Sequence, residues 1–589
     1  MSETNYRELF HFASQAFEPE TFYVTNFQGT EGLNTLFCFD IELVSKDAAI
    51  DTDKLLNAPA VFSIHRDNGK DAVFHGYLSR VEQGGMFNGY AYYKVELRPA
   101  FWKFTQVVQS AIFLNKTVQQ VAEELVNGEQ FFRLPHEFRF TRQDYPAQEF
   151  AMQYGESIYE YILWRMEEQG AYFYFAENSD RIIFADTPQS HATSSVRVTY
   201  SPTSGLEGNH REEVLIDFTL AQTPLPKRVV VRTFDWKNPE KVVLGSADVA
   251  SDGLGDVHLT DENVESDDEA TRIAKIRAEE LVCRSRVFSG AGSVPCLRPG
   301  VVFTLEAHYN DKFNRDYLVT EISHQGSQES FLTLGLGIPL REKREHLFYR
   351  NTFSCIASDV PYRPARKASR AKISGVIRAF VDGAGSGARA EMDSFGRYKI
   401  LFPFDISGRS AGNASCWIRM AQPQVGKDSG LGFPLLPGTE VTVAFLGGNP
   451  DRPVITGALA NGGTGSITGQ GNVNFSGIRT PGGNQITFND TDNKQGISLL
   501  SASGLGLSFA DGSPNTSTWT TDNAISAAGL CSNDLTGMCK NLYSGYKTTT
   551  AAAKDRKWFA FLPTIINGVG QAASDAFKSL SQNTANGTA

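Results

Sequence analysis

The sequence predicts a mainly β-sheet protein with α-helical insertions, divided into several domains. Short runs of alternating apolar residues recur along the chain and are separated by Gly, Pro and Asn, as is typical of β-strands. The chain has 53 Gly, 41 Phe and 20 Tyr among its 589 residues, which supplies many turns and an aromatic core. A chain of this length is too long for one hydrophobic core and favours about four domains.

Residues 1–365 are predicted to form a hub of two β-barrel-like units with helical insertions. Candidate strands lie at residues 22–24, 37–43, 73–78, 92–97, 171–175 and 301–305. A Ser or Thr followed three residues later by Glu or Gln can form a capping box, and three such pairs predict helix starts. These begin at Thr117, Ser157 and Ser266. We expect the second helix, residues 158–169, to end at Gly170, because glycine adopts the left-handed conformation that closes many helices.

Residues 373–462 are predicted to form an oligonucleotide/oligosaccharide-binding (OB) type barrel, which a basic and polar linker, residues 366–372, joins to the hub. Its strands are short apolar runs between Gly-, Pro- and Asn-rich turns, as in other small barrels. The apolar members are Tyr398, Ile400, Phe402, Trp417, Ile418, Met420, Val441, Val443 and Phe445. The net charge of −11 disfavours a nucleic acid as partner.

Residues 463–512 are predicted to form a short β-prism from three intertwined copies of the chain. The candidate strands, 484–488, 496–500 and 505–509, each offer two or three apolar residues, too few for a core of their own. Packing three copies around one axis would bury those residues, so the pattern favours a homotrimer. The expected inward residues are Ile486, Phe488, Ile497, Leu499, Leu505 and Leu507.

Residues 513–589 change composition to Thr, Ser, Asn and Ala and are predicted to form a partly helical tail. Apolar residues at roughly helical spacing suggest short helices that dock on an effector or an adaptor. The candidate docking residues are Leu530, Leu535, Met538, Leu542, Trp558, Phe559, Leu562 and Ile566. The tail contains no His, no Glu and four Asp, which leaves little for acid–base catalysis.

No residue is predicted to be catalytic, to bind a cofactor or to ligate a metal. Gly408–Gly412 matches G-x-S-x-G around Ser410, but that motif requires a strand before it and a helix after it, and no helix pattern follows. His308 and His324 flank a predicted hairpin, yet the ten histidines lack metal-ligand spacing. We therefore expect a structural protein and not an enzyme.

The chain is expected to fold in the cytoplasm. Residues 1–20 are polar and acidic, unlike a signal peptide. The seven cysteines are scattered, and the nearest two, Cys531 and Cys539, are eight residues apart, a pattern that favours reduced thiols. No apolar run reaches the ~20 residues that span a bilayer, so stable membrane insertion is not expected.

Three motifs in the barrel carry a family resemblance. They are D-x-F-G-R-x-K-I at 393–400, C-W-I-R-x-A-Q-P at 416–423 and G-N-P-D-R-P-V-I-T-G at 448–457. These motifs resemble those of VgrG, the spike family of type VI secretion systems. The hub adds matching words at 153–157 and 361–364, and the resemblance extends over residues 20–512.

The resemblance implies a homotrimeric spike that caps a tube of hexameric Hcp rings, pierces target envelopes and carries effectors. It also implies a PAAR-repeat tip protein on the prism, and secretion into target cells without a signal peptide. Many family members extend the prism into a long needle, whereas the strand pattern here stops near Gly512. Two alternatives stay open: the hub-spike of a phage-like contractile injection particle, and a spike whose tail is a membrane-active toxin.

Overall fold

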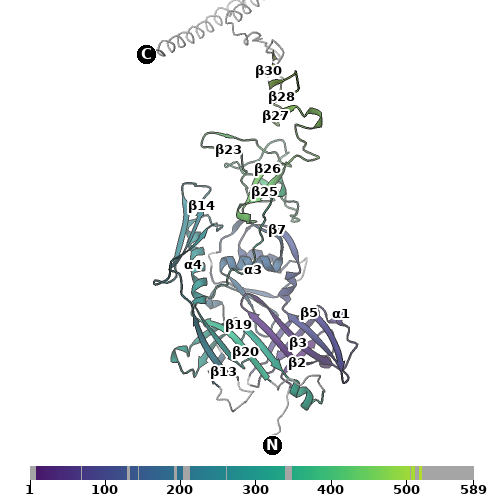
Figure 1. Ribbon diagram of the computed structural model, residues 1–589, viewed down its shortest axis with the longest axis vertical. Coiled ribbons are helices and arrows are strands. Elements are labelled where there is room, and N and C mark those ends of the chain that lie inside the picture. The colour runs from purple at the N-terminus through teal and green to yellow at the C-terminus, as the bar shows by residue number, and fades with distance from the viewer. Residues whose placement is uncertain are drawn as a thin grey trace, which may run out of the picture. The chain divides into compact units, whose positions relative to one another are not determined.

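The computed structural model divides into two units, residues 1–459 and 460–589, which we describe separately (Figure 1). Within them the structure describes residues 8–67, 69–128, 133–142, 145–191, 196–202, 213–260, 262–338, 348–503, 506–510 and 517–519. In their described residues both units are mainly β-sheet, as the sequence predicts, and the described α-helices all lie in the first unit.

A twelve-stranded sheet forms the framework of the hub. Its order is β1-β4-β5-β6-β3-β2-β19-β18-β12-β13-β17-β20. The strands are β1 (Phe10–Ser14), β2 (Tyr23–Gly32), β3 (Thr35–Ser45), β4 (Pro59–Ile64), β5 (Ala72–Phe87), β6 (Tyr90–Arg98), β12 (Val196–Tyr200), β13 (Val214–Gln222), β17 (Arg286–Gly292), β18 (Val302–Glu306), β19 (Asp316–Ser327) and β20 (Phe348–Ala357). Aromatic side chains fill the first half of this sheet; the rings of Phe39 and Phe74, for example, lie 4.3 Å apart.

Strand β19 joins the two predicted barrel units into one sheet. Residues 316–318 of β19 pair with β18, residues 321–327 pair with β2, and β20 pairs along nearly its whole length. The β19–β20 pairing closes β18, β12, β13, β17, β20 and β19 into a six-stranded ring. The two units are therefore not separate sheets, because one long strand belongs to both.

In the first half of the sheet, the side chain of Gln328 links the edge strand β1 to strand β2. The buried Gln328 Oε1 accepts hydrogen bonds from the backbone N–H groups of Leu9 and Phe10, at 3.0 and 2.9 Å. Its Nε2 donates to the carbonyls of Phe10 and Val24, at 2.8 and 2.9 Å. The amide thus satisfies backbone groups of β1 and β2 that have no strand partner there.

Three helices of the hub begin where the sequence predicts. They are α2 (Val118–Val126), α3 (Ile158–Gln169) and α4 (Asp267–Ser285); the single turn α1 (Thr52–Leu55) was not predicted. Thr117 and Ser157 form complete capping boxes, and Gly170 ends α3 with a φ of 69°. At Ser266 the box is incomplete, because the Glu269 carboxylate accepts from the backbone of Glu265 instead.

Smaller sheets surround these helices. Helix α4 packs on the three-stranded sheet β15-β14-β16, where Val229, Val231 and Val243 meet Ala270 and Ile273. The remaining hub strands are β7 (Val108–Lys116), β8 (His136–Arg139), β9 (Gln148–Ser157), β10 (Tyr172–Phe175), β11 (Ile182–Ala185), β14 (Arg228–Phe234), β15 (Val242–Asp248) and β16 (Asp256–Thr260).

The predicted OB-type barrel contains a four-stranded sheet in the order β22-β21-β25-β26. Its strands are β21 (Ile377–Asp382), β22 (Lys399–Leu401), β25 (Glu440–Phe445) and β26 (Pro453–Ala458), and β23 (Gln424–Val425) and β24 (Gly430–Leu431) pair separately. Single bridges join Tyr398 to Ile418 and Met420 to Ile455. Most of the predicted apolar residues are buried, but Trp417 is half-exposed, with the Lys399 amine 5.1 Å from its ring centroid.

The described part of the second unit contains five antiparallel strands in sequence order. They are β27 (Phe475–Arg479), β28 (Gln485–Asn489), β29 (Gly496–Leu500), β30 (Gly506–Ala510) and β31 (Ser517–Trp519). The sequence predicts only β28, β29 and β30. Strands β27 and β31 were missed because Gly and Ser interrupt their short apolar patterns.

Candidate functional site

An ion-pair cluster joins the hub to the barrel. The buried carboxylate of Asp451, in the loop before β26, accepts from Nη2 of Arg165 on α3 at 2.8 Å and from Nη2 of Arg370 at 2.7 Å. It also accepts from the backbone N–H of Met152 on β9, at 2.8 Å. Burial lowers the pKa of Arg165, but the attraction of Asp451 outweighs that effect, and the pKa of this guanidinium lies above its ordinary value.

The indole of Trp164 completes this junction. Its ring lies 4.2 Å from the guanidinium carbon of Arg165 and 4.6 Å from that of Arg370. Its Nε1 donates to the carboxylate of Glu156 at 3.1 Å. Burial raises the pKa of Glu156 to about 7, and the hydrogen bond from Trp164 only partly offsets that effect.

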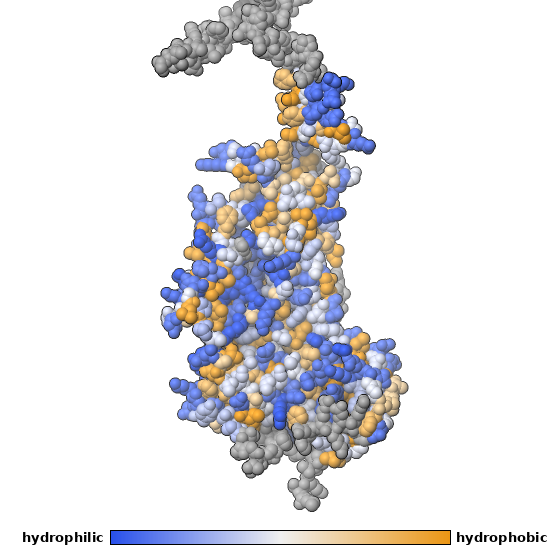
Figure 2. Space-filling view, in the orientation of Figure 1, coloured by the Kyte–Doolittle hydropathy of each residue, from blue (hydrophilic) through white to orange (hydrophobic). Residues whose placement is uncertain are grey.

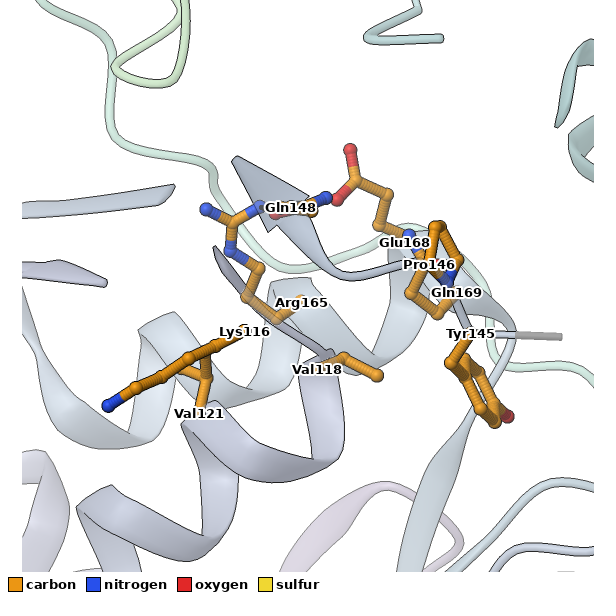
Figure 3. A pocket seen from close by; sticks show the side chains of 9 residues that line it. All are labelled: Lys116, Val118, Val121, Tyr145, Pro146, Gln148, Arg165, Glu168 and Gln169. Atoms are coloured by element: carbon orange, nitrogen blue, oxygen red, sulfur yellow. Dashed lines mark hydrogen bonds and ion pairs between the residues drawn. The ribbon is translucent and has the colours of Figure 1, made fainter. Parts of the chain in front are cut away.

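A crevice beside the junction has room for one water molecule but not for a substrate. Its volume is about 10 Å³ (Figure 3). Nη1 of Arg165 donates to Gln148 at 2.8 Å and lies 3.5 Å from Glu168. Nε of Arg165 and Oε2 of Glu168 are buried without a hydrogen-bond partner, which suits one bridging water. The residues that line it are Lys116, Val118, Val121, Tyr145, Pro146, Gln148, Arg165, Glu168 and Gln169.

The predicted linker, residues 366–372, makes polar contacts with both the hub and the barrel. Arg366 pairs with Glu262 at 2.8 Å, and the N–H of Ala368 donates to Glu167 at 2.9 Å. With Arg370 on Asp451, these contacts fix the path between hub and barrel. The limits of the predicted domains, 1–365, 373–462, 463–512 and 513–589, stay predictions.

An apolar sheet face in the second unit forms a second candidate site. Ile486 lies opposite Leu499, and Leu499 lies opposite Leu507, while Phe488 lies opposite Ile497. Because alternate residues of a strand share a face, all five lie on one side of the sheet. Phe488, Ile497 and Leu499 are 41%, 46% and 52% exposed, and Figure 2 shows apolar surface along these strands. The sixth predicted inward residue, Leu505, lies outside the described residues.

Other candidates from the sequence do not assemble into a site. Ser410 lies in an exposed loop where Ala411 and Gly412 have positive φ, and no helix begins directly after this loop, whose residues are all described. His308 packs among aromatic rings such as Tyr200, whereas His324 bonds to Glu31 in a different cluster. The docking residues predicted in the tail, and the Cys531–Cys539 pair, lie outside the described residues.

The part of the chain that the structure describes contains no group of three or more His, Cys, Asp or Glu that could hold a metal ion. No helix in that part is long and apolar enough to cross a membrane.

The Asp451 junction is not predicted from the sequence. Arg165 and Asp451 are 286 positions apart in the sequence, so no local spacing relates them. One signal was available: Arg165 falls between Trp164 and Met166 on a helix with many buried residues, where an arginine needs a partner.

Two family models match the chain. The phage tail baseplate hub model matches residues 30–330, which is 301 of 589 residues, and an injector OB-domain model of type VI secretion systems and phage baseplates matches residues 396–459. The chain belongs to the phage tail baseplate hub family. The second match confirms the predicted OB-type barrel, and both confirm the predicted relationship to VgrG-type spikes.

Curated and solved relatives agree with this family. The type VI secretion system spike protein VgrG1b of Pseudomonas aeruginosa is 29% identical over 75% of this chain and 59% of its own length. The E. coli c3393 protein, a component of the type VI secretion system similar to the T4 tail proteins gp27 and gp5, aligns with a TM-score of 0.54 and 23% identity over 76% of this chain and 99% of its own.

The lidded Francisella PdpA–VgrG complex aligns with a TM-score of 0.57 and 12% identity, over 85% of this chain and 78% of the other. At these identities the solved structures support the fold alone. The chain spans 59% and 60% of the length of VgrG1b and VgrG1c of Pseudomonas aeruginosa, and 41% of VgrG1 of Vibrio cholerae.

Proposed function

We propose that this protein is the homotrimeric spike at the tip of a type VI secretion machine. The observation that carries the proposal is the apolar face of strands β28, β29 and β30. In a single chain, side chains such as Phe488, Ile497 and Leu499 stand in water. Burying each of them would contribute about 1.5–3 kcal/mol, and three copies around one axis would cover all three faces at once.

The hub and barrel would give this trimer a rigid base. Ion pairs among buried groups have little freedom, because separating them leaves a charge without a partner in the protein interior. The Asp451 junction therefore resists bending between hub and barrel. Resistance to bending is what a part that pierces an envelope requires.

The remaining parts of the proposal rest on the family resemblance. The hub would cap a tube of hexameric Hcp rings, and a PAAR-repeat protein would sit on the prism. Effectors or adaptors would dock on the tail, residues 513–589. The spike would assemble in the cytoplasm and leave with the machine, without a signal peptide and without acting as an enzyme.

Complementation of a bacterium that lacks its own spike tests this function. The wild-type chain is expected to restore release of Hcp into the medium, and Leu499→Asp is expected to abolish it, since three charges would meet at one axis. Ser498→Asp is the matched control, because Ser498 is the next residue of β29 and faces the other side. Equal Hcp release by both variants would contradict the proposal.

The match to the phage tail baseplate hub model favours a second candidate function. The same trimer could serve as hub-spike of a phage-like contractile injection particle. Neighbouring genes distinguish the two: effector and immunity genes accompany a secretion spike, whereas capsid and tail-fibre genes accompany a phage-like particle.

A further inference from the structure

Residues 421–434 form an exposed arm on the barrel, which we call the barrel arm. Every residue of the arm is exposed. Its two short strands, β23 and β24, pair only with each other, and Figure 1 shows β23 away from the barrel sheet. Both ends are fixed to the barrel: the N–H of Ala421 donates to the carbonyl of Ile455 at 2.8 Å, and the N–H of Leu435 donates to the hydroxyl of Tyr398 at 3.1 Å.

The composition of the barrel arm does not suit a free hairpin. Val425, Leu431 and Phe433 are 75%, 44% and 46% exposed. An isolated two-stranded hairpin is at best marginally stable in water, and three strands or packing on another element are needed for independent stability. The arm therefore requires a surface that this chain does not itself supply in the part the structure describes.

We propose that the barrel arm packs on the barrel of an adjacent copy of this chain. This inference rests on the proposed homotrimer. The barrel also exposes apolar side chains outside the arm: Val376 is 57% and Ile406 is 83% exposed. Each copy thus carries both an apolar arm and apolar surface to receive one, which is what a cyclic arrangement of identical subunits requires.

Charge and chain connectivity favour a second copy over an unrelated partner. The arm is neutral, because Lys427 and Asp428 at its turn cancel, so it adds no repulsion against a chain of net charge −11. The barrel's last strand, β26, ends at Ala458, directly before the second unit. A trimer held by the second unit would tether three barrels together and raise the effective concentration of each arm near its neighbours.

Photo-crosslinking in the full-length protein tests this contact. A benzophenone amino acid at position 425, irradiated in the purified protein, is expected to give covalently linked chains on a denaturing gel. Mass spectrometry should map the link to residues 373–458 of the other copy. Changing Leu431→Ser and Phe433→Ser in the same protein should reduce the linked product about tenfold, because the apolar contact is lost. Lys427→Ser, at the turn, is the matched control and should leave the yield unchanged.

Light scattering on the same sample separates the failure of this inference from the failure of the proposed function. A trimeric mass without linked chains, or a link outside the barrel, would overturn the arm contact and leave the trimer standing. A monomeric mass would overturn both. Irradiation inside cells adds one more outcome: a link at position 425 to a different protein, in place of a second copy, would also reject the contact.

Discussion

At the scale of single residues, Asp451 is one of the residues that hold the barrel on the hub; Ile112, Phe150 and Met152 also pack against the barrel core. Its carboxylate binds Arg165 and Arg370, and it also accepts from the backbone of Met152. Removing one member of a buried ion pair leaves the other charge buried without compensation, which costs about 3–5 kcal/mol. The cost of removing one partner is therefore larger than the net stabilisation that the intact ion pair contributes.

Asp451→Asn is therefore expected to destabilise the hub–barrel junction by about 3 kcal/mol. The side-chain volume is retained, so the loss reports on charge. Two measurements report the effect. The melting temperature should fall, and the rate of proteolysis within residues 366–372 should rise. Asp428→Asn removes an exposed carboxylate from the same barrel and is the control. Equal melting temperatures of the two variants would show that the ion pairs of Asp451 do not stabilise the protein.

Glu156 makes the stability of the hub depend on pH. Burial raises the pKa of this carboxyl from 4.5 to about 7, so the folded protein holds a proton that the unfolded chain releases above pH 4.5. Its contribution to stability is full below that pH and declines as the pH rises towards 7, because the charged form is disfavoured in the folded state. The groups that act on it are Trp164, the backbone of Tyr154, Arg165 and Glu160.

Glu156→Gln is expected to remove this dependence and keep an oxygen that accepts from Trp164. From pH 5 to pH 8 the variant should become more stable relative to the wild type. The difference in their free energies of unfolding should change by on the order of 1–3 kcal/mol, and a growing difference in melting temperature measures it. Glu123→Gln, exposed on α2, should show no such trend. A constant difference across this range would refute the assignment.

Residue-level predictions from sequence succeeded where the cause is local. Thr117 and Ser157 cap their helices because their partners lie three residues away, and Gly170 ends α3 for a local backbone reason. Asp451 was part of a recognised motif, but its partners come from α3 and the linker. Nothing in the motif itself identifies a partner so distant in sequence.

At the scale of elements, the side chain of Gln328 replaces strand pairing between β1 and β2 in the sheet of the hub. Gln328→Leu would leave buried backbone groups of Phe10 and Val24, and the partly buried N–H of Leu9, without their hydrogen-bond partner. Each unsatisfied group costs about 1–3 kcal/mol, so the hub should melt several degrees lower. Gln325→Leu, exposed on the neighbouring strand β19, is the control. Equal melting temperatures would show that β1 does not need the bridge.

Element positions were more predictable than their connections. The strand patterns at 37–43 and 92–97 correspond to β3 and β6, which pair with each other. The continuity through β19 was not predictable, since β19 pairs with β2 almost 300 residues earlier in the chain. Alternation identifies which residues face the core, but it does not identify which strand lies alongside.

At the scale of the whole molecule, the tail is predicted to matter for cargo and not for assembly. A variant lacking residues 513–589 should keep its trimeric state and its support of Hcp release, and should lose delivery of one specific effector. The physical reason is that short amphipathic helices bury their apolar faces on a partner. Effector delivery into recipient cells measures the outcome. If every effector is delivered at the wild-type level, the tail is not a docking element.

The central claim is that three copies of this chain form one spike. Static light scattering of the purified full-length protein tests it most directly, because mass does not depend on shape. The expected mass is three times 64.7 kDa, and it should not change on dilution through the micromolar range, since the apolar faces of β28, β29 and β30 stay buried only in the trimer. A mass of 64.7 kDa at micromolar concentration would contradict the account.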